Sequence, residues 1–153
     1  MSHSSKFVDS IPDLSDFLQL KTLNIVSFDF LSNINGPRDF TPLVTALSTV
    51  TPSSALCTII FTRIPWAPSW RMDAEGWSAL DAVLVNLAQS HPKLRVTFSF
   101  NTQLPPCPRS AKSLVLETAL KEHLPSFLAQ NGYAEVTMTQ RPDVIYGHRV
   151  IKL

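Results

Sequence analysis

Short segments in which apolar and polar residues alternate recur along the chain, and this recurrence limits the fold more than any other feature. Their apolar cores are Leu23-x-Ile25, Ile59-x-Phe61, Leu94-x-Val96 and Val136-x-Met138. The leading residues of these cores fall 36, 35 and 42 positions apart. Because the alternation has period two, each segment is predicted to be a β-strand with one buried face.

Between the predicted strands the apolar spacing changes to that of helices. Residues 41–50 predict a helix with Thr41 as N-cap and Pro42 at its first position. Residues 110–124 predict another, which meets Pro125 and is followed by a last turn that ends at Gly132. The proline-rich residues 101–110, between the third predicted strand and the helix over residues 110–124, predict a loop. This loop would account for the longer last interval between strand cores.

The clearest helical pattern runs from Asp73, a predicted N-cap, to the residue before Pro92. Its apolar stripe comprises Trp77, Leu80, Leu84 and Leu87. Its outer face is expected to hold Ser78, Asp81 and Asn86. A large aromatic residue on such a stripe packs against a sheet, so Trp77 is predicted to close the core.

Strands that alternate with helices predict parallel neighbours, because each helix must cross back over the sheet before the next strand begins. The fold class is therefore α/β. A period of about 37 residues fits a leucine-rich-repeat-like solenoid of three to four strand–helix units. It also fits a compact parallel α/β sheet. Sequential strand order and an open sheet face would favour the solenoid, whereas another order and a closed pocket would favour the compact sheet.

The two ends of the chain carry weaker patterns. Residues 10–20 predict a short helix that caps the first unit, with Ile11, Leu14 and Leu18 facing inward. Residues 143–153 predict a closing strand. Length and composition predict one α/β domain over residues 1–153, of which residues 1–8 are expected to be flexible.

Charge and composition exclude several classes of protein. Thirteen Lys and Arg against 12 Asp and Glu leave a net charge of +1, and the basic residues are scattered, so a nucleic-acid partner is not expected. The chain carries neither a long apolar run nor the pattern of a signal peptide, which predicts no membrane association and a cytoplasmic or nuclear location. The two cysteines do not make a disulfide framework.

Candidate binding residues gather in the segment Ile64 to Arg71. Arg63, Trp66, Trp70 and Arg71 lie in or beside it, just after a predicted strand, where loops of α/β proteins often bind ligands. Trp66 and Trp70 either cover an edge of the core or form this binding patch. The spacing of histidines, cysteines, carboxylates and glycines predicts no metal site, no catalytic residue and no cofactor, and therefore no enzyme.

Part of this pattern resembles a known family. In the first part of the pattern, a Trp, a Leu-Asp pair and a Leu precede an extended strand; these are Trp77, Leu80, Asp81 and Leu84, followed by residues 94–98. In the second part, Leu124, Pro125 and Gly132 precede a last strand at Val136. Between about Leu18 and Met138 the chain resembles the C-terminal leucine-rich-repeat-like region of F-box-like proteins of mushroom-forming fungi. The resemblance implies a curved repeat with a parallel sheet on one face and helices on the other.

The resemblance also implies a role. Members of that family dock through an N-terminal F-box on the adaptor of a cullin-type ubiquitin ligase, and their repeats hold the substrate. This chain begins a few residues before its first repeat, so we expect the repeat part without the F-box. The function expected is a protein–protein interaction module for an unidentified protein partner. The alternative is a small-molecule binder or enzyme with a pocket around Trp66 and Trp70.

Overall fold

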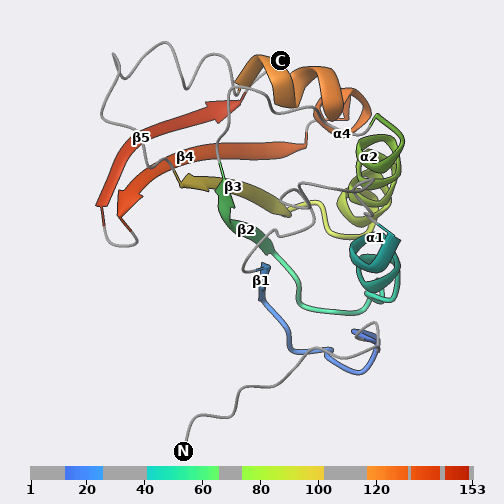
Figure 1. Ribbon diagram of the computed structural model, residues 1–153. Helices are drawn as coiled ribbons and strands as arrows, with labels where there is room; N and C mark the ends of the chain where they lie inside the picture. Colours follow the sequence, from blue (N-terminus) through green and yellow to red (C-terminus); the bar gives the residue numbers. More distant parts are fainter. Residues whose placement is uncertain are drawn as a thin grey trace, which may run out of the picture.

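The computed structural model describes residues 13–25, 41–65, 74–101, 117–130, 132–141 and 144–151 of the chain, and strands and helices alternate along it (Figure 1). The strands are β1 (Thr22–Ile25), β2 (Thr58–Pro65), β3 (Arg95–Asn101), β4 (Tyr133–Arg141) and β5 (Val144–Ile151). The helices are α1 (Thr41–Ser48), α2 (Ala74–Ser90) and α4 (Pro125–Ala129), and residues 117–123 are also helical.

All the described strands belong to one sheet, in the order β1-β2-β3-β4-β5. The first four strands pair in parallel, and β5 pairs antiparallel to β4. The α/β class and the parallel sheet predicted from the alternating pattern are therefore confirmed. The predicted closing strand exists as β5, and it runs against the other four.

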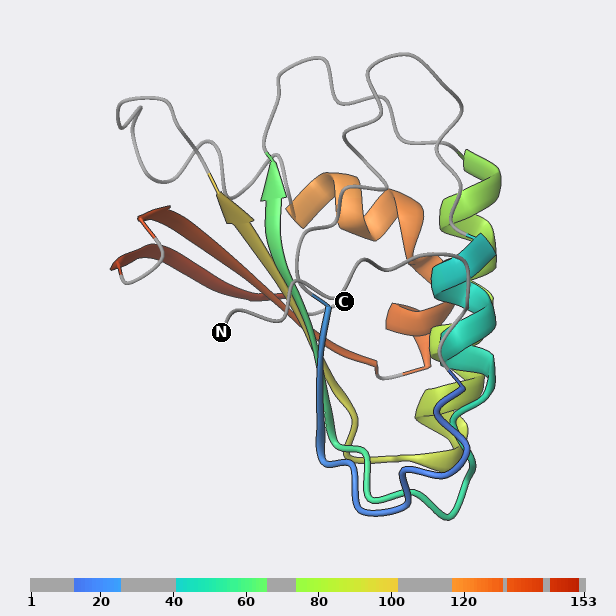
Figure 2. The same cartoon turned by 60° about the horizontal axis from the view of Figure 1, so that its bottom comes forward.

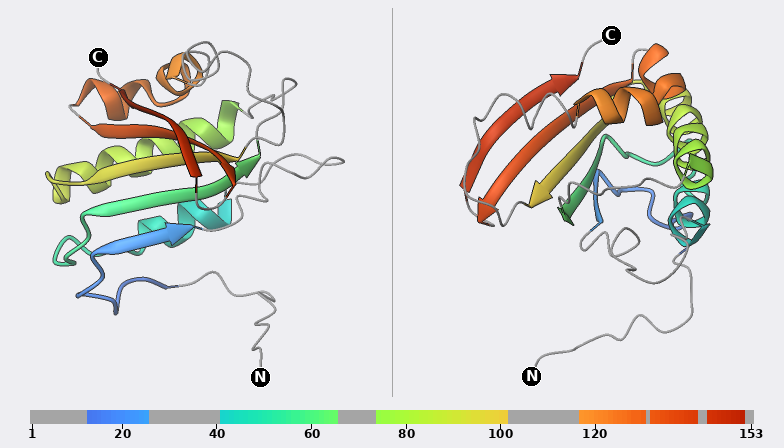
Figure 3. Two further views of the ribbon diagram at one scale, coloured as in Figure 1. Left: turned by 90° about the vertical axis from the view of Figure 1, so that its left-hand side faces the viewer. Right: turned by 45° about the horizontal axis from the view of Figure 1, so that its top comes forward.

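The described helices lie on one side of the sheet (Figure 2). A parallel crossover is right-handed in almost all proteins, so crossovers that always advance to the next strand place every helix on the same face. Along this layer α1 packs beside α2, and α2 packs beside α4. The left panel of Figure 3 looks onto the opposite face of the sheet, with the helices behind it.

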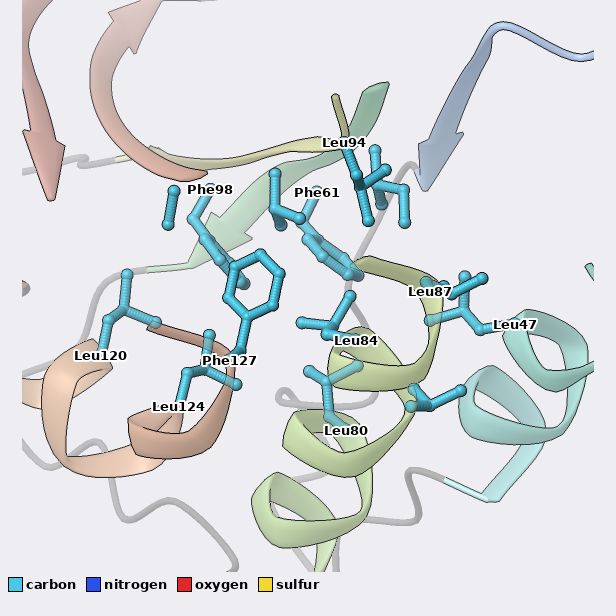
Figure 4. Packing of buried hydrophobic residues seen from close by; sticks show 14 of the residues in the cluster. Leu47, Phe61, Leu80, Leu84, Leu87, Leu94, Phe98, Leu120, Leu124 and Phe127 are labelled. Carbon is cyan, nitrogen blue, oxygen red and sulfur yellow. The ribbon is translucent and has the colours of Figure 1, made fainter. Parts of the chain in front are cut away.

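The core lies between the sheet and the helix layer (Figure 4). Phe61 of β2 and Phe98 of β3 stack with ring centroids 4.9 Å apart. Trp77 is 1% exposed, and its ring centroid lies 6.3 Å from that of Phe98. The prediction that Trp77 closes the core is thus confirmed. Its stripe partners on α2 are also buried, namely Leu80, Leu84 and Leu87.

The register of the sheet corrects the alignment of the last two repeat cores. Leu23 pairs with Ile59 as expected, but Ile59 pairs with Val96 and Val96 pairs with Ala134. The alignment that placed Leu94 and Val136 at these positions was wrong by two residues at each strand. Because side chains alternate with period two, such a shift keeps every apolar residue on its face and leaves no trace in the pattern. The residues 101–110 therefore do not account for a longer last unit.

Two further expectations were wrong. Residues 13–20 form turns rather than a capping helix, with Leu14 half-buried and Leu18 exposed. Asp81 does not face away from the core; it is 5% exposed and accepts hydrogen bonds from the backbone of α4. Ser78 and Asn86 are exposed, as predicted.

Candidate functional site: the polar face of the sheet

The face of the sheet that the described helices leave uncovered is lined mainly by polar side chains, and we call it the polar face. Alternation along each strand puts these residues opposite the buried ones. Its described members are Thr22, Asn24, Thr58, Ile60, Thr62, Arg95, Thr97, Ser99, Tyr133, Glu135 and Thr137, of which Thr137 is itself buried and the others are exposed or half-buried. A parallel sheet is usually covered by helices on both faces, so a polar uncovered face is a distinctive feature of this chain.

The strands align these residues into rows across the sheet, which we call rungs. The first rung contains Thr22, Thr58, Arg95 and Tyr133. The second rung contains Asn24, Ile60, Thr97 and Glu135. Neighbouring strands lie about 4.8 Å apart, so the four members of a rung extend over about 14 Å.

A cluster of three side chains stands at the β3–β4 side of the face. The guanidinium carbon of Arg95 lies 5.0 Å from the centre of the Tyr133 ring, which is a cation–π distance. The hydroxyl of Tyr133 donates a hydrogen bond to Oε1 of Glu135. The hydrogen bond to Glu135 thereby holds the Tyr133 ring at its hydroxyl end, and the guanidinium of Arg95 lies over the face of this ring.

The charges in this cluster act on Tyr133. The pKa of Tyr133 is raised, first because its hydroxyl donates to Glu135 and then because of partial burial and the negative charge of Glu135; the positive charge of Arg95 opposes this shift. The phenol therefore stays protonated at neutral pH and remains a donor. The hydrogen bond that fixes the ring persists across the physiological range.

On the β1–β2 side the face is also ordered by hydrogen bonds. The hydroxyl of Thr62 donates to Oδ1 of Asn24 over 3.2 Å, and it lies 3.5 Å from the carbonyl oxygen of Ile25. Thr22 and Asn24 are exposed, and Thr58 and Thr62 are half-buried. Hydroxyl and amide groups of this kind can exchange hydrogen bonds with a bound polypeptide.

The described side chains of the polar face are mainly neutral hydrogen-bonding groups. Among its described side chains Glu135 is the one carboxylate, and it already accepts the Tyr133 hydroxyl. These side chains include no histidine or cysteine that could act as base or nucleophile. Within the described ranges, no group of three or more His, Cys, Asp or Glu residues could hold a metal ion.

The residues predicted as a binding site can be placed only in part. Arg63 belongs to β2. Trp66, Trp70 and Arg71 lie outside the described residues, as do Cys107 and residues 1–8. Cys57 is a free cysteine, and its thiol donates to the carbonyl oxygen of Lys21 over 3.2 Å. The patch of tryptophans and arginines remains a prediction.

Arg95 and Tyr133 were not foreseen as site residues. Alternation within residues 95–100 puts Arg95 on the face opposite the apolar residues, and this signal was available in the sequence. Tyr133 lies beside Arg95 because of the register of β3 and β4. Alternation with period two does not determine this register, because a shift by two residues gives the same pattern.

Two buried polar residues outside the polar face are engaged in structural hydrogen bonds. Nε2 of His91 lies 2.9 Å from the hydroxyl of Ser54, and Nδ1 lies 3.1 Å from the carbonyl oxygen of Leu87. This arrangement ties the end of α2 to the segment before β2. Asp81 serves α4 in the same way. These hydrogen bonds occupy both residues, so they do not extend the candidate site.

Comparisons of the chain with protein-family models, with curated protein sequences and with solved structures found no match. In the part of the chain that the structure describes, no helix is both long and apolar enough to cross a membrane.

Proposed function

We propose that the chain is a non-enzymatic protein–protein interaction module that binds a protein through its polar face. One observation carries the proposal: a parallel sheet with all its described helices on one side presents ordered hydroxyl, amide and guanidinium groups on the other. Such groups, with an Arg and a Tyr among them, are typical of surfaces that bind polypeptides.

The proposal includes the finer architecture and role that the family resemblance implies. Sequential strand order and helices on one side support a short solenoid of strand–helix units, in which each unit contributes one strand to a continuous binding face. In this role the chain is the substrate-recognition part of an F-box-type protein, and its partner is a protein destined for ubiquitylation.

Site-specific photo-crosslinking tests the proposed surface. A benzophenone amino acid replaces Thr97, in the middle of the polar face, and in a matched variant it replaces Asn86, which is exposed on α2. Both proteins are irradiated in a lysate of a mushroom-forming fungus, the group to which the resemblance points. We expect a discrete crosslinked protein from the Thr97 position and none from the Asn86 position.

A second arm tests whether the captured protein is bound by the face itself. Ser99→Arg places a bulky charge beside Thr97, and we expect it to reduce crosslinking at least about tenfold, because hot-spot disruptions cost more than about 1.4 kcal/mol. Equal crosslinking from Thr97 and Asn86, or no effect of Ser99→Arg, would contradict the proposed surface. Unchanged ubiquitylation of the captured protein on overexpression of the chain would contradict the substrate-recognition role alone.

A further inference from the structure

The two charged side chains of the described polar face differ in whether they already have a hydrogen-bond or ion-pair partner. Among the described side chains of this face, Arg95 and Glu135 are the two that carry a charge. Glu135 accepts the hydroxyl of Tyr133. Arg95 is exposed and forms no ion pair with any carboxylate among the described residues. Glu135 keeps its negative charge but is engaged with Tyr133, so Arg95 is the charged group of the described face that is exposed and has no ion pair with a described carboxylate, and it lies at one point of the first rung.

The guanidinium of Arg95 is held in place before any partner arrives. Its carbon lies 5.0 Å from the centre of the Tyr133 ring, and the ring is fixed through its hydroxyl by Glu135. A guanidinium that stacks on an aromatic ring still has its N–H groups in its own plane. There they can bind a carboxylate with two parallel hydrogen bonds. Holding the side chain in advance also lowers the entropy lost on binding.

From this geometry we infer that the partner is an extended peptide segment with an Asp or Glu side chain that binds Arg95. The inference rests on the proposed function and specifies the partner of that same face. The segment crosses the strands along the first rung, where Thr22 and Thr58 offer hydroxyl groups on the β1–β2 side of Arg95. A rung of about 14 Å corresponds to about four or five residues of extended chain.

The charge pattern favours a carboxylate over a polyphosphate backbone. Nucleic acids are bound by several cations that follow the phosphates, whereas the described side chains of the polar face include a single arginine and no lysine. A single preorganised guanidinium matches a single carboxylate. The neutral rest of the rung matches the uncharged positions of a short peptide segment.

Selection from a random 12-residue peptide library displayed on phage tests the inference with the intact chain. We expect wild-type protein to enrich peptides with Asp or Glu, and Arg95→Gln to abolish the acidic enrichment. Arg95→Glu should instead enrich Lys or Arg. Lys93→Gln is the matched control, because it removes an exposed positive charge two residues away and should leave the acidic enrichment unchanged.

A selected peptide then serves as a probe for affinity. Arg95→Gln should weaken its binding at least about tenfold, and Tyr133→Ala should also weaken it, because Arg95 loses its support. Affinity should fall as salt rises. Thermal melting of each variant checks that it folds like the wild type.

The outcomes separate this inference from the proposed function. If no peptide is enriched, or if acidic peptides are enriched equally by wild type and Arg95→Gln, the inference is overturned. Enrichment of other peptides that Arg95→Gln leaves unaffected and Ser99→Arg abolishes would also overturn it, yet would support the polar face as a binding surface. Failure of the crosslinking experiment, in contrast, removes the proposed function itself.

Discussion

The imidazole of His123 lies against the indole of Trp77, with ring centroids 5.4 Å apart. Burial lowers the pKa of His123 from its usual value of 6.5, and the negative charge of Glu122 opposes the shift. The unfolded chain therefore binds a proton at a higher pH than the folded chain does. By linkage, the free energy of unfolding is highest above pH 6.5 and falls as the pH drops below that value toward the lowered pKa of the folded state.

This sign gives a residue-scale prediction. Urea unfolding of the wild type between pH 7.5 and about pH 5 should show stability lost on acidification, and His123→Gln should show a smaller loss because it cannot take up the proton. The difference between the two proteins isolates His123 from the other titrating groups. Identical slopes of stability against pH would show that His123 does not contribute.

The sequence indicates much at this scale for apolar residues and little for polar ones. Spacing on α2 identified Trp77, Leu80 and Leu84 as buried, because a stripe at three- and four-residue intervals must find a cover. The same spacing placed Asp81 on the outer face. What brings Asp81 inward is a second helix beside α2, and no local pattern contains that neighbour.

At the scale of elements, Asp81 joins α2 to α4. Its Oδ2 accepts from the backbone N–H of Ser126 over 3.0 Å, and its Oδ1 accepts from that of Phe127 over 2.8 Å. Leu124, at the N-cap position of α4, makes no side-chain hydrogen bond to the helix. A residue about two helical turns into α2 thus supplies the cap that the sequence of α4 lacks.

Loss of this cap should lower the stability of the protein. Asp81→Ala leaves the buried N–H of Phe127 and the part-buried N–H of Ser126 without an acceptor, and we expect it to lower the free energy of unfolding by about 2–4 kcal/mol. Ser78→Ala, an exposed change on the same helix, should alter it by less than about 0.5 kcal/mol. Equal urea midpoints for the two variants would show that Asp81 does not support α4.

The elements themselves were predictable, and their alignment was not. Alternation and helical spacing located each strand and the helices between them, and the parallel pairing followed from the crossovers. The register between β3 and β4 was missed by four residues, because Val96 pairs with Ala134 and not with Met138, and Arg95 and Tyr133 were therefore not seen as neighbours. Register depends on contacts between segments, so a candidate site built across strands is harder to predict than the strands.

At the scale of the whole molecule, the sheet is asymmetric. β3 lies between β2 and β4, and its buried side chains Val96, Phe98 and Phe100 are fully covered. β1 is four residues long, pairs with β2 alone among the described strands, and has half-buried Leu23 and Ile25. Phe17 and Leu18, beside β1, are the large apolar side chains most exposed within the described residues.

Hydrogen exchange should report this gradient. We expect backbone amides of residues 22–25 to exchange at least about ten times faster than those of residues 95–101, because local opening at a half-buried edge costs less free energy than opening at the centre. Mass spectrometry of peptic fragments measures both regions in one sample. Equal protection of the two strands would mean that the edge is covered in solution.

The rungs determine which experiments can map the binding residues. The first rung draws Thr22, Thr58, Arg95 and Tyr133 from four separate quarters of the polypeptide. No contiguous fragment shorter than the 112 residues from Thr22 to Tyr133 carries that set, so short overlapping fragments of the chain would fail to reproduce binding by the intact protein. A substitution in any single quarter could change which ligand is preferred while leaving the other three contact points as they were.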